Sequence, residues 1–101
     1  MESLKRLVGL TIKDIVKLHD YLQLYLSDGT IVTIYNNYSF KKKSGELFEK
    51  KKIVSVSETK DSIDFTIENV GNIIVSLNDE AFNGPEALEL SKKNQPTIIW
   101  S

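Results

Sequence analysis

The chain of 101 residues contains no cysteine and only one histidine, His19. The absence of cysteine excludes disulfide scaffolds, thiolate nucleophiles, iron–sulfur clusters and zinc sites that use cysteine. A single histidine also excludes a metal centre built from several histidines. We therefore expect neither a metal nor a cofactor.

Long apolar runs are missing as well. No window approaches the roughly 18 apolar residues that a membrane helix needs, and residues 1–6 lack the apolar core of a secretion signal. We expect a cytoplasmic protein that does not associate with membranes. The formal net charge is −1, so the chain as a whole has no strong electrostatic preference for nucleic acid.

Catalytic signatures are also absent. The sequence contains no glycine-rich phosphate or dinucleotide loop, no zinc-protease helix motif and no nucleophile elbow. His19 stands beside Asp20 at a predicted turn, where neighbours along the chain cannot orient each other as a base and its helper. Acidic pairs such as Asp61 and Asp64 could act as an acid and a base, but such pairs are common on any β surface and do not by themselves indicate catalysis. We predict that the protein is not an enzyme and has no catalytic residue.

The clearest positive signal is an alternation of apolar and polar residues with a period of two. Leu22, Leu24 and Leu26 fall on one face of a predicted strand. An Asp-Gly pair follows, which is typical of a β-hairpin because glycine tolerates the positive φ that a tight turn requires. The β-branched residues within 30–35 then form the antiparallel partner strand.

The same pattern returns downstream, so that residues 9–35 and 50–77 form a predicted internal repeat joined by residues 36–49. The offset is 41 up to the glycine turn and 42 after it, which aligns Ile31 with Ile73. Each half alone would leave one apolar face in water, so we expect two packed sheets or one strongly curled sheet. The alternative is a chance match, since any antiparallel meander resembles another.

The segments outside the repeat complete the expected fold. Residues 36–49 are predicted to form a turn, a lysine-rich polar break and one helical turn. Residues 78–85 predict a short cap that ends at Gly-Pro, and residues 86–100 predict a pair of strands. Residues 4–8 have the apolar spacing of a short helix. We therefore predict one mainly β domain over residues 1–101, with about eight antiparallel strands and one or two short helices.

Residues 7–12, residues 21–30 and residues 79–88, together with the ending 98–100, carry a resemblance. The chain resembles small β-rich bacterial domains of the uncharacterised or toxin-immunity type, and the Gly-Pro-Glu-Ala-Leu stretch at 84–88 is the most distinctive part of the likeness. The resemblance implies a non-enzymatic role in binding a partner, such as a toxin of contact-dependent growth inhibition. It assigns no catalytic residue.

Charge is distributed unevenly along the chain. Residues 41–52 contain six Lys against two Glu, whereas residues 53–91 contain one Lys against eight acidic residues. We expect the acidic segment to bind a basic protein partner, such as a nuclease toxin, by mimicking the phosphates that the toxin grips. The chain is then an immunity protein that neutralises its toxin. The residues expected on this acidic face are Glu58, Asp61, Asp64, Glu68, Asp79, Glu80 and Glu89.

Two alternative surfaces stand beside the acidic face. Lysine clusters flank Tyr38, Phe40 and Phe48, which suits a basic loop that steers nucleic acid and stacks on its bases. Such lysines also serve solubility and the protection of edge strands. Two tyrosines point away from the leucines of their strand, so either the N-terminal helix covers them or they form an interface. The residues of these alternatives are Tyr21, Tyr25, Lys41, Lys42, Lys43, Lys50, Lys51 and Lys52.

Overall fold

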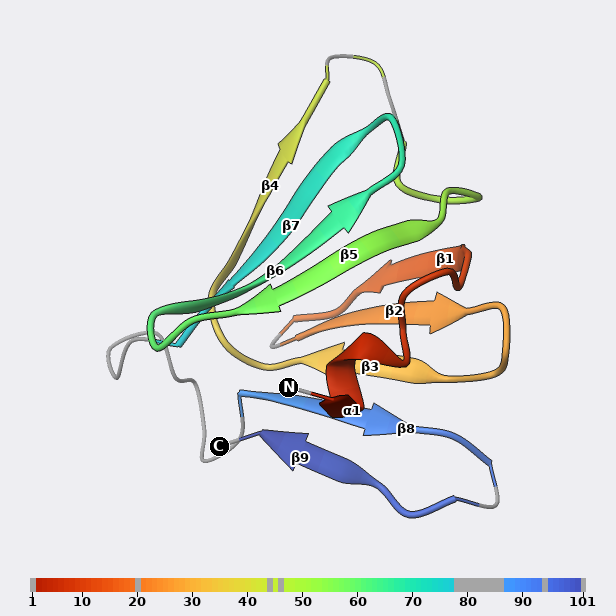
Figure 1. Ribbon diagram of the computed structural model, residues 1–101, viewed down its shortest axis with the longest axis vertical. Coiled ribbons are helices and arrows are strands. Elements are labelled where there is room, and N and C mark those ends of the chain that lie inside the picture. The colour runs from red at the N-terminus through yellow and green to blue at the C-terminus, as the bar shows by residue number, and fades with distance from the viewer. Residues whose placement is uncertain are drawn as a thin grey trace.

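The computed structural model describes residues 2–19, 21–43, 45, 47–77, 87–93 and 95–100. These residues form one short helix and nine strands, which Figure 1 shows as a ribbon. In chain order the elements are α1 (Glu2–Lys5), β1 (Ile12–Lys17), β2 (Leu22–Leu26), β3 (Ile31–Ile34), β4 (Tyr38–Lys42), β5 (Ile53–Glu58), β6 (Ser62–Ile67), β7 (Gly71–Ser76), β8 (Leu88–Ser91) and β9 (Ile98–Trp100).

The strands form two antiparallel sheets. One sheet has the order β1-β2-β3-β8-β9, and the other has the order β4-β7-β6-β5. In Figure 1, β5 and β1 lie side by side in the middle of the molecule, and β4 and β9 form its two outer margins. The structure thus confirms the predicted mainly β fold, with one meander (β1, β2, β3) in one sheet and its copy (β5, β6, β7) in the other.

The core lies between the two sheets. The inward-facing residues of β2 and β6 are at most 2% exposed: Leu22, Leu24 and Leu26 in the first strand, and Ile63, Phe65 and Ile67 in the second. Leu4 of α1 and Leu7 after it belong to the same cluster, as does Phe48 from the segment before β5. Full burial of such a side chain contributes roughly 1.5–3 kcal/mol, so the alternating residues hold the sheets together.

The two halves repeat each other at a constant offset of 41. A β-bulge interrupts the pairing of β1 with β2 between Ile12 and Asp14, and a second bulge interrupts the pairing of β5 with β6 between Ile53 and Ser55. A bulge adds a residue to one strand and bends it, so its position is a specific feature of a sheet and not a random irregularity. Two bulges at matched positions are strong evidence that the halves share one design.

The offset of 42 predicted beyond the turn is wrong. Both hairpin loops have the same length, since the strands on either side pair at the same spacing. The positive φ falls on Gly29 in the first loop, at 90°, but on Asn69 in the second, at 58°. An alignment of the two loop glycines therefore inserts one residue too many, and Ile31 corresponds to Asn72 instead of Ile73.

The halves meet where β1 and β5 begin, around an approximate two-fold axis. Thr11 and Lys52, which are counterparts at the offset of 41, pair with each other in an antiparallel bridge. Four backbone hydrogen bonds flank this bridge as two matched pairs: Ile12 N–H to Lys51 O with Ile53 N–H to Leu10 O (both 2.9 Å), and Gly9 N–H to Ile53 O (2.7 Å) with Lys50 N–H to Ile12 O (2.6 Å). A residue that pairs with its own counterpart lies on the axis.

The fourth strand of each sheet comes from the other half of the chain. β8 follows the second meander but pairs with β3, and β4 follows the first meander but pairs with β7. The registers match, since Ile34 pairs with Leu88 and Val75 pairs with Tyr38. β4 is therefore the counterpart of β8, and this exchange of strands ties the two sheets together.

β4 itself is not predicted from the sequence. It lies within residues 36–49, where we expect a turn and a polar break, because its lysines hide the alternation of Tyr38 and Phe40. The described residues of the same segment do not form the predicted helical turn, because Lys51 N–H donates to Phe48 O across a tight turn in which Lys50 has a left-handed φ of 67°. The predicted cap at 78–85 lies outside the described residues.

Candidate protein interface

The predicted acidic face is divided in the structure. Asp64 lies on the outer side of β6, and its Oδ1 accepts a hydrogen bond of 2.7 Å from Asn72 Nδ2. Asp61 is exposed in the turn before β6. Glu58 lies on the inward parity of β5, beyond Val56, and its Oε1 is buried without a hydrogen-bond partner. These three residues share one end of the sheet but not one face.

The other acidic residues lie farther away. Glu68 is exposed in the turn after β6, at the opposite end of that strand from Asp61. Glu89 belongs to β8 in the other sheet, where its Oε2 accepts a hydrogen bond of 3.1 Å from the Tyr35 hydroxyl. Asp79 and Glu80 lie outside the described residues. The structure therefore does not bring the described members of the acidic set onto one surface.

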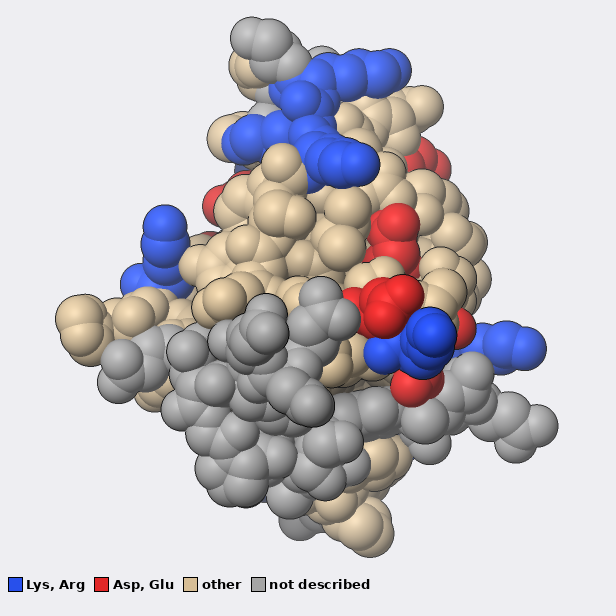
Figure 2. Space-filling view, turned by 90° about the vertical axis from the view of Figure 1, so that its left-hand side faces the viewer, with Lys and Arg blue, Asp and Glu red and all other residues tan. Residues whose placement is uncertain are grey.

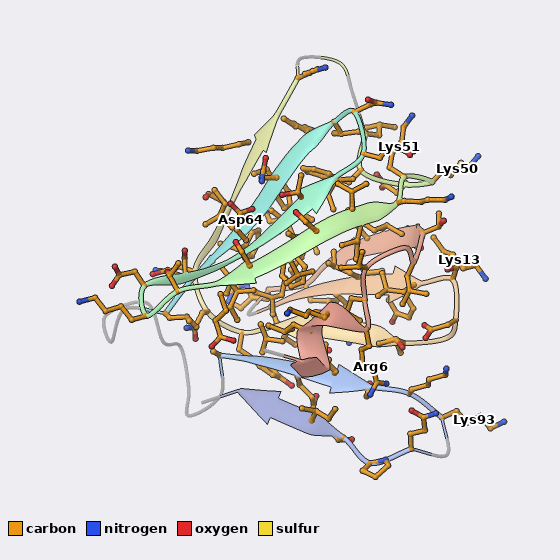
Figure 3. All side chains as sticks on the ribbon, viewed as in Figure 1. Arg6, Lys13, Lys50, Lys51, Asp64 and Lys93 are labelled. Carbon is orange, nitrogen blue, oxygen red and sulfur yellow. The ribbon has the colours of Figure 1, made fainter. Side chains whose placement is uncertain are left out.

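The lysines are more concentrated. Figure 2 shows basic side chains gathered at the top of the molecule, where β4 ends in Figure 1, and acidic side chains in smaller groups below them. In the view of Figure 3, Lys13, Lys50, Lys51 and Lys93 project from one side of the molecule, while Asp64 lies toward the other. Lys41, Lys42, Lys43, Lys50 and Lys52 are exposed, and Lys51 is half-buried.

The aromatic residues beside these lysines form a short stack. The ring centroids of Tyr38 and Phe40 are 5.5 Å apart, and those of Phe40 and Phe48 are 5.1 Å apart. Lys42 Nζ lies 5.7 Å from the centre of the Phe48 ring. Phe48 is only 2% exposed, whereas Phe40 is 40% exposed. Phe48 is therefore not available to stack on a base, and Phe40 is the aromatic residue that β4 exposes to solvent.

The outward edge of β4 also carries unpaired backbone groups. Asn37 O accepts from Ser76 N–H, and Lys43 N–H donates to Val70 O, so the odd-numbered residues bond to β7. Bonded and non-bonded residues alternate along an antiparallel strand. The N–H and C=O groups of Tyr38, Phe40 and Lys42 therefore point away from the sheet, and no described strand pairs with them. We call this feature the β4 edge, defined by Tyr38–Lys42 and Lys43.

A shallow hollow adjoins the β4 edge. It encloses about 390 Å³ between residues 41–43 and the turn from β6 to β7. Gly71 forms part of its wall with a φ of 151°, and a Cβ at this position would overlap the carbonyl oxygen of Lys41. Glycine is thus required here because it lets β4 approach β7 closely.

The two predicted interface tyrosines lie on the outer side of the other sheet, and both are half-buried. The Tyr21 ring lies 5.9 Å from that of Tyr35, and the Tyr25 hydroxyl donates to Gln23 Oε1 at 2.9 Å. The expectation that the N-terminal helix covers them is wrong, because α1 contacts β5 and buries Leu4 in the core. Their neighbours on the same sheet cover them instead.

The described residues contain no group of three or more His, Asp or Glu side chains placed to hold a metal ion. Within the same residues, no helix is long and apolar enough to cross a membrane. Comparisons of the chain with protein-family models, with curated proteins and with solved structures find no significant match.

The candidate residues predicted from the sequence include the lysines of this surface, but its central feature, the unpaired edge of β4, is not predicted. The internal repeat could have predicted this strand. The repeat places Tyr38 and Phe40 in the position of Leu88 and Leu90, and a strand predicted for one pair predicts a strand for the other.

Proposed function

We propose that the protein is a non-enzymatic binding module of the immunity type, which binds and neutralises a bacterial toxin in the cytoplasm. The observation that carries this proposal is the β4 edge. It combines unpaired backbone groups, one exposed aromatic ring and three consecutive lysines at the margin of a four-stranded sheet. An apolar centre with a charged rim is typical of a protein interface.

The same observation favours the β4 edge over the acidic set as the main contact. A partner that meets the lysines presents acidic groups, since complementary charge steers association and excludes wrong partners. A second candidate surface is the outer side of β6 around Asp64, whose carboxylate accepts a hydrogen bond from Asn72. A basic toxin would use that surface in the way that the sequence predicts.

The test uses the product of the reading frame next to this one in the source genome. That product is expressed in a bacterial host with and without this chain, and growth is measured. The Lys41→Ser/Lys42→Ser/Lys43→Ser variant is expected to lose protection, and the Asp64→Lys/Glu68→Lys/Glu89→Lys variant is expected to keep it. Circular dichroism serves as the control that both variants fold.

Three other outcomes would contradict the proposal or change it. Loss of protection in the acidic variant alone would assign the interface to the acidic residues. A neighbouring product that is harmless to the host, and that does not bind this chain in a pull-down, would overturn the immunity proposal. Binding of a labelled single-stranded RNA that requires the three lysines and weakens steeply with salt would favour a nucleic-acid function instead.

A further inference from the structure

The approximate two-fold axis relates an occupied strand edge to an empty one. β9 pairs with β8 along its outer edge, with Leu88 opposite Trp100 and Leu90 opposite Ile98. β4 is the counterpart of β8, yet no described strand pairs with its outer edge. We propose that the β4 edge accepts an extended acidic strand of the partner protein, in the register that β9 uses on β8. This inference rests on the proposed function and specifies how the partner binds.

The outer edge of β4 has unpaired N–H and C=O groups that can bond to such a strand. The outward groups of Phe40 correspond to those that Leu90 offers to Ile98 of β9. Addition of a strand satisfies exposed N–H and C=O groups, and the side chains on either side decide which strand is accepted. Main-chain bonding at Tyr38, Phe40 and Lys42 therefore supplies affinity, while the side chains of β4 supply selectivity.

The apolar requirement follows from the occupied edge. Ile98 is half-buried and packs against the core beside Leu90. Phe40 holds the equivalent place and is 40% exposed, whereas Leu90 is 2% exposed. The difference is the area that a partner strand would cover. The residue opposite Phe40 is therefore apolar, and the residue two positions later, opposite Tyr38, is large and apolar like its counterpart in β9.

The acidic requirement follows from a missing counter-charge. Lys92, just after β8, lies 3.3 Å from the carboxylate of Asp28. The counterpart of Lys92 is Lys42, but the counterpart of Asp28 is Asn69, which has no charge. A carboxylate on the incoming strand, two positions before the residue that faces Phe40, restores this pair. Lysines on an edge disfavour pairing with a strand that brings no acidic groups, so they contribute to selectivity as well as to affinity.

A second copy of the chain is a poorer occupant. Antiparallel pairing of two β4 edges around Phe40 places Lys42 of each copy opposite Tyr38 of the other, so it brings no carboxylate to Lys42 and adds the positive charge of both copies to one two-stranded ribbon. Nucleic acid is also a poorer occupant, because base stacking needs exposed rings and Phe48 is buried. An acidic strand alone uses the backbone, the exposed ring and the charges together.

The experiment titrates the full, isotope-labelled chain with the synthetic peptide SDEITWTG, capped at both ends, up to millimolar concentration. Its Ile faces Phe40, its Trp faces Tyr38 and its Asp faces Lys42. Chemical shifts and amide exchange are followed by NMR. The amides of Phe40 and Lys42 are expected to gain protection, while those of Ser39 and Lys41, which already face β7, serve as the control within the same strand.

Two control peptides separate strand addition from simple charge attraction. N-methylation of the Ile removes its bond to the β4 backbone and is expected to weaken binding by about tenfold or more. Replacement of Asp and Glu by Lys is expected to abolish binding. A peptide that binds equally well when N-methylated, or that leaves the Phe40 and Lys42 amides unprotected at millimolar concentration, overturns the inference.

Two variants of the chain complete the design. Asn69→Asp supplies Lys42 with the counter-charge that Lys92 already has, and it is expected to weaken peptide binding several-fold without loss of stability. The matched change Asp28→Asn, at the other hairpin, is expected to leave peptide binding unchanged. Dimerisation through β4 in sedimentation, without peptide, would assign the edge to a second copy. If this chain protects the host against the neighbouring gene product but the peptide does not protect the Phe40 amide from exchange, the proposed function stands and strand addition is rejected.

Discussion

Lys50 adopts the left-handed backbone conformation of Gly9, its counterpart in the other half of the chain. The φ angles are 67° and 92°, and both residues donate a backbone hydrogen bond across the junction of the halves. The two-fold arrangement thus imposes on a lysine a conformation that costs an L-residue roughly 1–2 kcal/mol. The junction fixes this backbone whatever residue occupies it.

Lys50→Gly is therefore expected to stabilise the protein. Relief of the left-handed strain outweighs the added freedom of glycine in the unfolded chain, which is about 0.4–1 kcal/mol, and leaves a net gain of about 0.5 kcal/mol. Gly9→Ala is the matched change and is expected to destabilise by about 1 kcal/mol. Urea unfolding measures both. Equal losses in the two variants would show that the junction does not impose the conformation.

Gly71 is required for a different reason, which is the lack of space for a side chain. An added Cβ would overlap the Lys41 carbonyl oxygen, and the φ of 151° is itself unfavourable for other residues. Gly71→Ala is expected to lower the free energy of unfolding by about 2–4 kcal/mol through the steric clash and the backbone strain. Gly29 has a φ of 90° but open space around it, so Gly29→Ala is expected to cost only about 1 kcal/mol. Similar urea midpoints for the two variants would contradict the close approach of β4 to Gly71.

Local patterns predict the strands of this fold well. The alternation of Leu22, Leu24 and Leu26 depends only on residues two apart, and a half-buried sheet requires that spacing wherever it packs. The exchange of β4 and β8 between sheets is different. It is decided by pairing between residues far apart in the chain, such as Val32 with Leu90, and no local pattern records that choice.

The candidate site shows the same division. The parity of each strand correctly places Asp64 and Glu89 on outer faces, next to buried neighbours. Parity does not say which sheet a strand joins, and these two residues belong to different sheets. The acidic face predicted from the sequence therefore depends on long-range pairing that the sequence does not reveal. The β4 edge depends on it too.

Phe40 and Leu90 provide a direct test of the unequal edges. They are counterparts, but Phe40 is 40% exposed and Leu90 is 2% exposed. Phe40→Ala is expected to cost about 1–2 kcal/mol of stability, because the ring is partly buried against Tyr38 and Phe48 and burial stabilises in proportion to the apolar area covered. Leu90→Ala is expected to cost about 2–5 kcal/mol, as buried leucines do. Phe40→Ala is nevertheless expected to abolish binding of the acidic peptide, so of the two variants it has the smaller effect on stability by urea unfolding but a large effect on affinity by NMR.

Measuring both stability and affinity also distinguishes a core role of Phe40 from an interface role. A Phe40→Ala protein that unfolds as readily as Leu90→Ala would show that Phe40 belongs to the core. A Phe40→Ala protein that binds the peptide as tightly as the unaltered chain would remove the ring from the interface.

Asp28 predicts the response of the protein to acid. Partial burial raises the pKa of its carboxyl group, but hydrogen bonds from Thr30 N–H (2.9 Å) and from Lys92 (3.3 Å) outweigh this effect and hold the pKa below its ordinary value of 3.8. The unfolded chain therefore binds the proton more tightly than the folded chain. The contribution of Asp28 to stability is complete above the unfolded pKa and is lost as the pH falls from about 4 through the lower pKa of the folded state.

Asp28→Asn is expected to remove this dependence. The difference in unfolding free energy between the unaltered chain and the variant is expected to be below about 1 kcal/mol at pH 6, since the pair is exposed, and to shrink as the pH falls below 4. Lys92→Ala is expected to remove part of the dependence only, because the Thr30 N–H still donates to the carboxylate. Urea unfolding at pH 6, 4 and 3 measures all three proteins. A difference that grows toward pH 3 would contradict the lowered pKa and the pairing of Asp28 with Lys92.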